Sequence, residues 1–233
     1  GDVNPLAVKA LVEKYYGPIP AKKLPERKPQ LEPEQKGEKR ATLKAPAESP
    51  QIMMAWKVPK LDPKKMDEVD PYALLVLSAV LSGHDNSRLN RELVRNQRVA
   101  NSAGATYELI SRGPELFVIG ATAAKGQTVQ DLEKGIVQTL RDIANQGVTE
   151  SELKRIKAQL LASQIYKRDS IFGQAMEIGS AEIAGVSWKQ LDPILDRLQA
   201  VTPEQVQAVA KKYLIDDTLT IATLEPQVRG ATK

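Results

Sequence analysis

Alternation of apolar and polar residues predicts two β-strands in the first quarter of the chain. In residues 51–58 every second side chain is apolar, as on a strand with one buried face: Ile52, Met54, Trp56 and Val58. Trp56 is therefore expected in the core. A second strand is predicted at residues 38–44, and the segment between the two strands contains two prolines that favour a turn.

The next apolar segment predicts a helix that is buried on most sides. Residues 71–81 are apolar nearly all round, which is typical of a helix enclosed by other elements. A second helix is predicted at residues 87–97. Strands are predicted at residues 99–109 and 115–123, and the sequence Ser-Arg-Gly-Pro between them favours a tight turn, so these two strands are expected to pair antiparallel.

Helical periodicity dominates the last hundred residues. One helix is predicted at residues 129–143, and Thr149 with Glu152 has the spacing of a capping box that opens another. The side chains of this second helix that are expected to face inward are Leu153, Ile156, Leu160 and Ile165. A helix opened at Thr202 and a strand at residues 218–224 end the pattern. Grouped strands and grouped helices predict an α+β fold with a mainly antiparallel sheet.

The first 37 residues differ in character from the rest. A short helix is expected after Pro5, and Gly17 ends it. Five prolines lie between residues 18 and 33 among charged and amide side chains, which favours an extended connector. No initiator methionine and no targeting segment precede the helix, so we expect the chain to be a fragment of a longer polypeptide.

Composition and charge exclude several classes of protein. The net charge of +4 comes from residues 21–44, which contain eight Lys and Arg and four Glu, and the remainder of the chain has no net charge. Two Phe and two Trp give no base-stacking platform, so nucleic-acid binding is not expected. The absence of cysteine excludes disulfides and thiolate zinc sites, and no apolar run reaches the ~18–20 residues of a membrane span.

Four local strings, in this order and at this spacing, resemble one half of a pitrilysin/insulinase-type zinc peptidase, whose motif is the inverted H-x-x-E-H. No single string is specific, but together they cover nearly the whole chain. They are Gly1–Val3 with Leu11–Pro20, Leu77–Leu93 with its Ser87-Arg88-Leu89, Val99–Ala103, and Val201–Glu204 with Ala210–Leu214 and Thr218–Ile221.

The resemblance implies a division of the chain and a set of partners. Residues 1–20 would be the tail of a preceding catalytic half, 21–37 a linker, 38–226 a C-terminal non-catalytic domain of pitrilysin-like fold with helices on one face of its sheet, and 227–233 a tail. In this family two similar halves enclose a chamber for extended peptides. The implied partners are an N-terminal catalytic half, on the same or a separate chain and carrying the zinc, and an extended or unfolded polypeptide.

The sequence lacks the residues for hydrolytic chemistry of its own. An inverted zincin site needs two His four residues apart, a Glu between them and a further Glu ligand, whereas this chain contains one His. His84 stands in a turn between Gly83 and Asp85, where it is expected to be a solvated or capping group. A triad of His84 and Asp85 with Ser82 or Ser87 is not expected, because neighbours in one turn rarely reach the required geometry. We therefore predict no metal site and no catalytic residue.

The family's C-terminal halves often lend the active site an Arg and a Tyr within the string L-R-x-x-x-G-x-A-Y-S. Residues 93–102 align with this string, and Val94 stands at the Arg position and Asn101 at the Tyr position. Valine cannot hydrogen-bond a substrate carbonyl and asparagine is shorter than a phenol, so the helper roles are not carried over. Arg95 and Arg98 are weak substitute candidates, because a one-residue shift turns an α-helical side chain by about 100°.

Two functions remain open from the sequence. The first is a non-catalytic peptidase half that closes the chamber and helps bind polypeptide for hydrolysis by an H-x-x-E-H half. The second is a non-proteolytic scaffold subunit, which the loss of the Arg/Tyr pair favours. A further surface, the basic run Lys154, Arg155, Lys157, Lys167 and Arg168, is expected to be the solvated side of a helix. By resemblance to secreted bacterial members we expect the periplasm or cell envelope, with mitochondrial or cytoplasmic location as the alternative.

Overall fold

The computed structural model describes residues 2–23, 25 and 33–227. The chain divides into two compact units, Gly1–Glu34 and Gln35–Lys233. Residues 24 and 26–32 of the segment expected as a linker, and residues 228–233 of the expected C-terminal tail, lie outside the described residues.

The first unit consists of one helix, α1 (Pro5–Tyr16). The side chain of Asn4 accepts hydrogen bonds from the N–H groups of Leu6 and Ala7, and Pro5 stands in the first turn, where its missing N–H costs nothing. None of the helix's side chains is buried.

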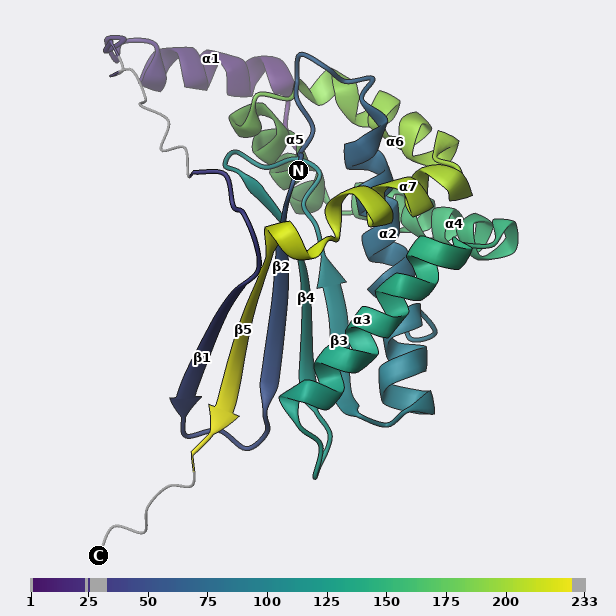
Figure 1. Cartoon of the computed structure of the whole chain (residues 1–233). Coiled ribbons are helices and arrows are strands. Elements are labelled where there is room, and N and C mark those ends of the chain that lie inside the picture. Colours follow the sequence, from purple (N-terminus) through teal and green to yellow (C-terminus); the bar gives the residue numbers. More distant parts are fainter. Residues whose placement is uncertain (1, 24, 26–32, 228–233) are drawn as a thin grey trace, which may run out of the picture. The chain divides into compact units, whose positions relative to one another are not determined.

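The second unit is built on a five-stranded sheet (Figure 1). Its strands are β1 (Lys39–Ala45), β2 (Gln51–Val58), β3 (Ala100–Thr106), β4 (Glu115–Ala123) and β5 (Leu219–Pro226), and their order across the sheet is β1-β5-β2-β4-β3. All neighbours pair antiparallel except β1 with β5, which are parallel. The expected mainly antiparallel sheet is thus confirmed, and β1 is one of its edges.

One face of the sheet carries the hydrophobic core. Along β2 the exposed and buried residues alternate as predicted, and Trp56 is only 2% exposed. Phe117 and Ile119 of β4 and Ile221 of β5 continue this buried face on the neighbouring strands. The alternation of apolar and polar residues therefore determines which side of each strand packs against the helices.

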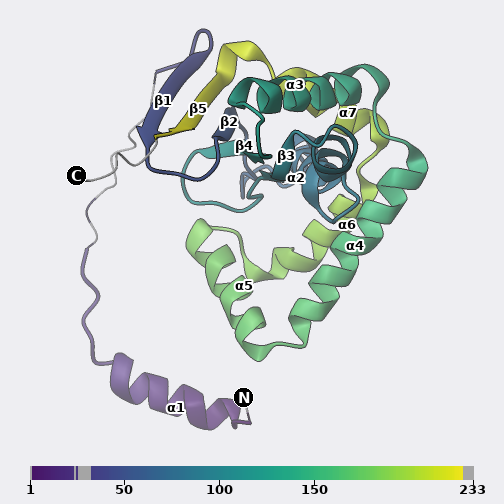
Figure 2. The same cartoon turned by 90° about the horizontal axis from the view of Figure 1, so that it is seen from below.

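Three helices cover this buried face, as Figures 1 and 2 show. They are α2 (Val69–Ser82), α3 (Val129–Gln146) and α7 (Pro203–Tyr213). Ten of the fourteen residues of α2 are buried, which explains why its sequence is apolar nearly all round. The expected α+β fold with helices on one face of the sheet is confirmed.

The remaining helices form an extension beside α2. These are α4 (Glu150–Arg168), α5 (Ile171–Ala184) and α6 (Leu191–Ala200). The short 3₁₀ turn η2 (Trp188–Gln190) lies between α5 and α6, and η3 (Asp216–Thr218) precedes β5. Two details differ from the sequence-based expectation. The helix α5 was not predicted, and Ile165, expected inward, is about half exposed on α4.

A π-helix stands where an α-helix was predicted before the β3–β4 hairpin. The segment η1 (Asn90–Asn96) is closed at its end by a hydrogen bond from the N–H of Gln97 to the carbonyl of Glu92, five residues earlier. A π-helix is wider than an α-helix, so the expected rotation of about 100° per residue does not hold here. The direction in which each side chain of this segment points had to come from the structure.

Candidate functional site

The positions at which the resemblance implied an Arg and a Tyr, occupied here by Val94 and Asn101, lie on η1 and β3. Val94 is partly buried and packs against the hydrophobic core, so its side chain supports the fold and offers nothing polar. Asn101 is the extra residue of a β-bulge between Ala100 and Ser102, and its Nδ2 donates to the carbonyl of Ala123 at 3.2 Å. Its side-chain amide is therefore already hydrogen-bonded to the backbone of the neighbouring strand β4.

The two arginines named as substitutes are both exposed. Neither the Arg95 nor the Arg98 guanidinium makes a hydrogen bond or ion pair with another described residue. Arg98 has a φ of 55°, a left-handed conformation that favours glycine, and it occupies the glycine position of the string L-R-x-x-x-G-x-A-Y-S. The structure does not bring either guanidinium together with a second functional side chain.

The turn around His84 contains no catalytic arrangement. The imidazole Nδ1 accepts the N–H of Asn86 at 3.0 Å, and Nε2 is enclosed without a partner among the described residues. The Ser82 hydroxyl is occupied because it donates to the carbonyl of Ala105 and accepts the N–H of the same residue, both at 2.8 Å. Ser87 Oγ is buried and unpaired in the part of the chain that the structure describes.

The residues present do not fit a hydrolytic zinc site. With one His in the sequence, the two imidazole ligands of an inverted zincin cannot both come from this chain. Over residues 2–23, 25 and 33–227, no three His, Asp or Glu side chains converge closely enough to hold a metal ion. The same ranges contain no helix with the length and apolar character needed to cross a bilayer.

The sheet face opposite the helices is a candidate surface. It forms a hollow of about 570 Å³ that is lined by residues of all five strands and by no charged side chain. The glycines Gly104 and Gly120 pair across β3 and β4 and keep the floor of the hollow low. Leu43 and Met53 are exposed at this face. We call these residues and their neighbours in the hollow the open sheet face.

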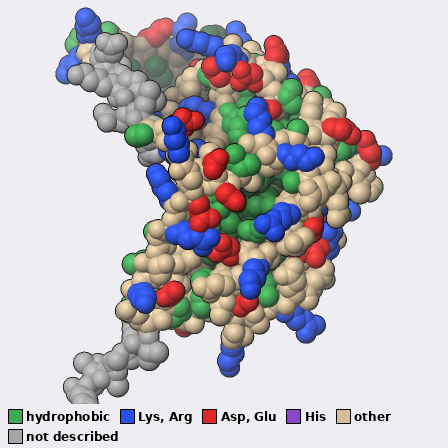
Figure 3. All heavy atoms as spheres, in the orientation of Figure 1, with side chains coloured by type: hydrophobic (Ala, Val, Ile, Leu, Met, Phe, Trp, Pro, Cys, Tyr) green, Lys and Arg blue, Asp and Glu red, His purple; other side chains and the backbone are tan. Residues whose placement is uncertain are grey.

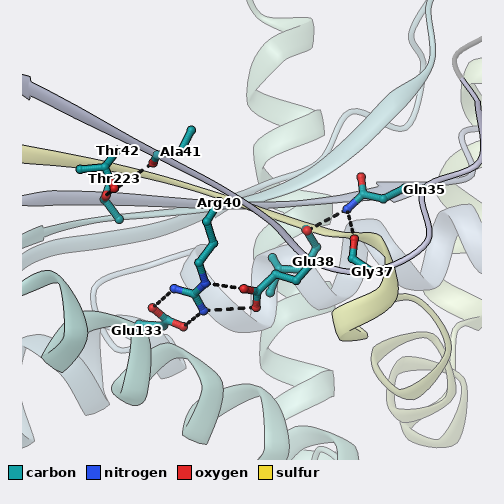
Figure 4. Close-up of polar contacts among 9 residues, drawn as sticks. Gln35, Gly37, Glu38, Arg40, Ala41, Thr42, Glu133 and Thr223 are labelled. Carbon is teal, nitrogen blue, oxygen red and sulfur yellow. Dashed lines mark hydrogen bonds and ion pairs between the residues drawn. The ribbon is translucent and has the colours of Figure 1, made fainter.

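The edge strand β1 is held to the rest of the second unit by polar contacts (Figure 4). Arg40 donates from both terminal nitrogens to the carboxylate of Glu133 on α3, at 2.9 and 2.6 Å, and it also binds Glu38. Both carboxylates raise the pKa of Arg40, with Glu133 the stronger influence, so the guanidinium stays charged. Before the strand, the buried Gln35 donates to the carbonyl of Leu219 at 2.8 Å.

The charge on the visible face of the second unit is mixed. Lys and Arg side chains are interspersed with Asp and Glu in Figure 3, and hydrophobic side chains lie between them. A phosphate backbone is held by a continuous positive stripe. This face does not offer one.

Comparison with known proteins decides the family. The family model described as "Peptidase M16 inactive domain" matches residues 1–160, more than half of the chain. The chain belongs to the peptidase M16 inactive-domain family. The expected resemblance to pitrilysin/insulinase-type zinc peptidases is thereby confirmed, and the absent H-x-x-E-H motif is consistent with an inactive domain.

Relatives of the M16 inactive domain are longer than this chain. This chain is 29% identical over 146 residues to "Uncharacterized zinc protease YmxG" of Bacillus subtilis. The matched region covers 63% of this chain and 35% of that protein. The chain is 28% identical over 144 residues to "Uncharacterized zinc protease SCO5738" of Streptomyces coelicolor, covering 61% of this chain and 31% of that one. The chain thus spans about a third of the length of these relatives.

Solved structures share the fold of this M16 inactive domain. A protease from Helicobacter pylori superposes with a TM-score of 0.86 at 24% identity, over 97% of this chain and 54% of that one. A peptidase M16 inactive domain from Pseudomonas fluorescens gives 0.78 at 20% identity, over 98% and 52%. At these identities the likeness establishes the fold.

Proposed function

We propose that the chain is the non-catalytic half of a zinc metalloendopeptidase, which closes the substrate chamber and helps bind an extended polypeptide for hydrolysis by an H-x-x-E-H half. The zinc would be bound by that catalytic half, on the same or a separate chain. The observation that carries the proposal is membership of the M16 inactive-domain family in a chain with a single histidine.

The open sheet face supports a role in the chamber wall. A surface without charged side chains and with a low glycine floor can lie close to a polypeptide backbone without selecting one sequence. The exposed edge of β1 offers unpaired backbone groups beside it, and an extended segment can pair with such an edge.

The proposed division of the chain follows the resemblance. Residues 1–20 would belong to the tail of the catalytic half, because α1 leaves its apolar side chains exposed: Leu6, Leu11, Val12, Tyr15 and Tyr16. Residues 21–37 would form the linker, 38–226 the non-catalytic domain and 227–233 a tail. The covering partner of α1 would then be the part of the catalytic half that precedes it.

A scaffold subunit without proteolytic role is the second candidate. Val94 is packed into the core, and the side chain of Asn101 is bound to the backbone of Ala123. Neither residue can therefore assist a reaction as Arg and Tyr would. This observation favours a chain that contributes shape and contacts to a larger assembly.

We place the protein in the periplasm or cell envelope, with mitochondrial or cytoplasmic location as the alternative. Support comes from one structural neighbour, the periplasmic protease PqqL of Escherichia coli, which shares the fold with a TM-score of 0.74 at 14% identity.

The test combines this chain with an H-x-x-E-H half and measures cleavage of a quenched fluorescent peptide. We expect no cleavage by the chain alone, and a kcat/KM for the mixture at least roughly tenfold above that of the catalytic half alone. The variant Met53→Glu, which places a charge on the open sheet face, should lower the mixture's kcat/KM. Ile165→Glu, at an equally exposed residue of α4 that does not line the hollow, is the matched control.

A catalytic half whose kcat/KM is the same with and without the chain would refute the proposed assistance. If the two polypeptides form a stable complex without any change in kcat/KM, the scaffold reading gains support instead.

A further inference from the structure

The helices α4, α5 and α6 form three sides of a frame, which Figure 2 shows as a triangle. A hollow of about 480 Å³ lies between these helices, Leu75 of α2 and residues 107–110 after β3. This volume is in the range of ~300–1,000 Å³ that is typical of small-molecule sites. We call it the helix hollow. No residue lines both the helix hollow and the open sheet face, so the two are separate sites.

The floor of the helix hollow is apolar. Five aliphatic side chains that are buried, or partly buried against the core, line it: Leu75, Leu109, Ile110, Ile194 and Leu195. A concave apolar surface favours a ligand with apolar side chains, because both surfaces leave water when the ligand binds.

Free charges of both signs line the helix hollow as well. Glu108 lines it from the loop after β3, Glu177 from α5 and Lys167 from the end of α4. None of these three side chains makes a hydrogen bond or ion pair with another described residue. Glu177 is only partly exposed. A partly enclosed carboxylate without a partner favours a cation beside it.

The other charges near the helix hollow are paired or lie outside it. Arg168 lines the hollow, but Asp192 of α6 binds its guanidinium. Asp169 does not line the hollow and makes no ion pair with Lys167. Two free carboxylates and one free ammonium group therefore remain around an apolar floor.

We propose that the helix hollow binds a short apolar peptide by its two free ends. Glu177 binds the α-ammonium group of the peptide, Lys167 binds its α-carboxylate, and the apolar side chains of the peptide lie on the floor.

The charges select this class of ligand over two others. A fatty acid or another anionic amphiphile would leave both carboxylates of the hollow without a partner. An internal segment of a longer polypeptide carries neither end charge. Short peptides with both ends free are products of proteolysis, and their binding here does not depend on the proposed assistance to a catalytic half.

Isothermal titration calorimetry of the whole chain with the tripeptide Leu-Ala-Leu measures the binding. We expect one site with a Kd on the order of 10–1,000 µM. Glu177→Gln should raise the Kd by roughly tenfold, because the charge that faces the ammonium group is removed. Asp196→Asn, at an exposed carboxylate of α6 that does not line the helix hollow, should leave the Kd unchanged. Circular dichroism checks that both variants keep the wild-type helix content.

Peptides with one blocked end assign each contact. N-acetylation of Leu-Ala-Leu should raise the Kd by roughly tenfold for the wild-type chain and change it little for Glu177→Gln, because the ammonium group and its partner act as a pair. C-terminal amidation should likewise weaken binding to the wild-type chain and have little effect on Lys167→Met. Disturbed packing of the helices would not depend on which end of the peptide is blocked.

Three results would overturn the proposal. They are no binding at millimolar peptide, a Kd that is insensitive to Glu177→Gln, and an equal Kd for the free peptide and for the peptide blocked at both ends. The third would indicate binding of an uncharged segment, as proposed for the open sheet face, so this inference and the proposed function can fail independently.

Discussion

Arg98 has the only positive φ outside glycine among the described residues, at 55°. Holding a residue with a Cβ in this conformation costs about 1 kcal/mol or more, and the exposed guanidinium makes no hydrogen bond or ion pair with a described residue that would offset the cost. We expect Arg98→Gly to raise the free energy of unfolding by about 0.5–1 kcal/mol, measured by urea denaturation.

The neighbouring Gln97 is the control, because its φ of −79° is an ordinary helical value. Gln97→Gly should lower the free energy of unfolding by up to about 1 kcal/mol. A loss of stability in both variants would show that Arg98 is held by contacts and not by strain.

Arg88 and Glu152 form an enclosed ion pair, with both side chains only 13% exposed. Arg88 donates from Nε and Nη2 to the two carboxylate oxygens at 2.9 and 2.7 Å, and from Nη2 to the carbonyl of Gly147 at 3.0 Å. We expect Glu152→Ala to cost about 3 kcal/mol in urea denaturation, because a partly buried guanidinium loses its partner.

The less enclosed pair of Arg91 and Glu92, with side chains 41% and 29% exposed, is the control, and Arg91→Ala should cost less than about 1 kcal/mol. Equal losses from Glu152→Ala and Arg91→Ala would mean that burial does not strengthen the Arg88 pair.

The role of a single residue could be predicted from the sequence only where the type of side chain alone rules a role in or out. A valine or an asparagine in place of an arginine or tyrosine can be read directly. The engagement of Asn101 with Ala123 and of Ser82 with Ala105 could not be predicted, because each contact joins residues more than twenty positions apart. The capping box expected of Thr149 and Glu152 did not foresee the ion pair: the Thr149 side chain accepts the N–H of Glu152, whereas the carboxylate of Glu152 binds Arg88.

At the scale of elements, β1 depends on contacts made before the strand begins. Gln35 is 8% exposed and its Nε2 donates to Leu219 and Gly37, so it holds the start of β1 to β5. We expect Gln35→Ala to cost about 1–2 kcal/mol and to raise amide hydrogen exchange in residues 39–45. Lys36→Ala, the adjacent exposed residue, should change neither quantity.

Exchange in β2 serves as the internal reference for Gln35→Ala. If residues 51–58 lose protection to the same extent as residues 39–45, the effect is global unfolding, and the local anchoring of β1 is contradicted.

Strong periodicity explains which elements could be predicted. Alternation along β2 and the apolar faces of α3 and α7 each point to one structure, and these elements lie where the sequence placed them. The helix α5 was missed because its apolar residues do not gather on one buried face. The π-helix η1 and the parallel β1–β5 pair depend on long-range packing that no local pattern records.

At the scale of the molecule, acid should weaken the links between elements. Burial alone would raise the pKa of Asp70, but hydrogen bonds from Lys212 and Tyr213 outweigh it and hold the pKa below its usual value. Burial likewise raises the pKa of Glu152, but the hydrogen bond and the charge of Arg88 lower it, and the net result is a pKa below the usual value. A carboxyl with a lowered pKa stabilises the fold above its ordinary pKa, and this stabilisation is lost as the pH falls.

We therefore expect the thermal midpoint to be nearly constant from pH 7 to about pH 5 and to fall below about pH 4, where unfolded carboxyls take up protons. Asp70→Asn should start from a lower midpoint at pH 7 and show a shallower fall. A midpoint that rises between pH 5 and pH 3 would contradict this assignment of signs.

The inability of this chain to hold a hydrolytic zinc ion is tested most directly by its zinc content after dialysis. The purified chain is equilibrated with excess zinc, dialysed against zinc-free buffer and measured by mass spectrometry of the metal, beside His84→Ala. We expect far less than one zinc per chain, with no difference between the two proteins, because one imidazole cannot supply a tetrahedral site. One tightly held zinc per chain that disappears in His84→Ala would contradict the account.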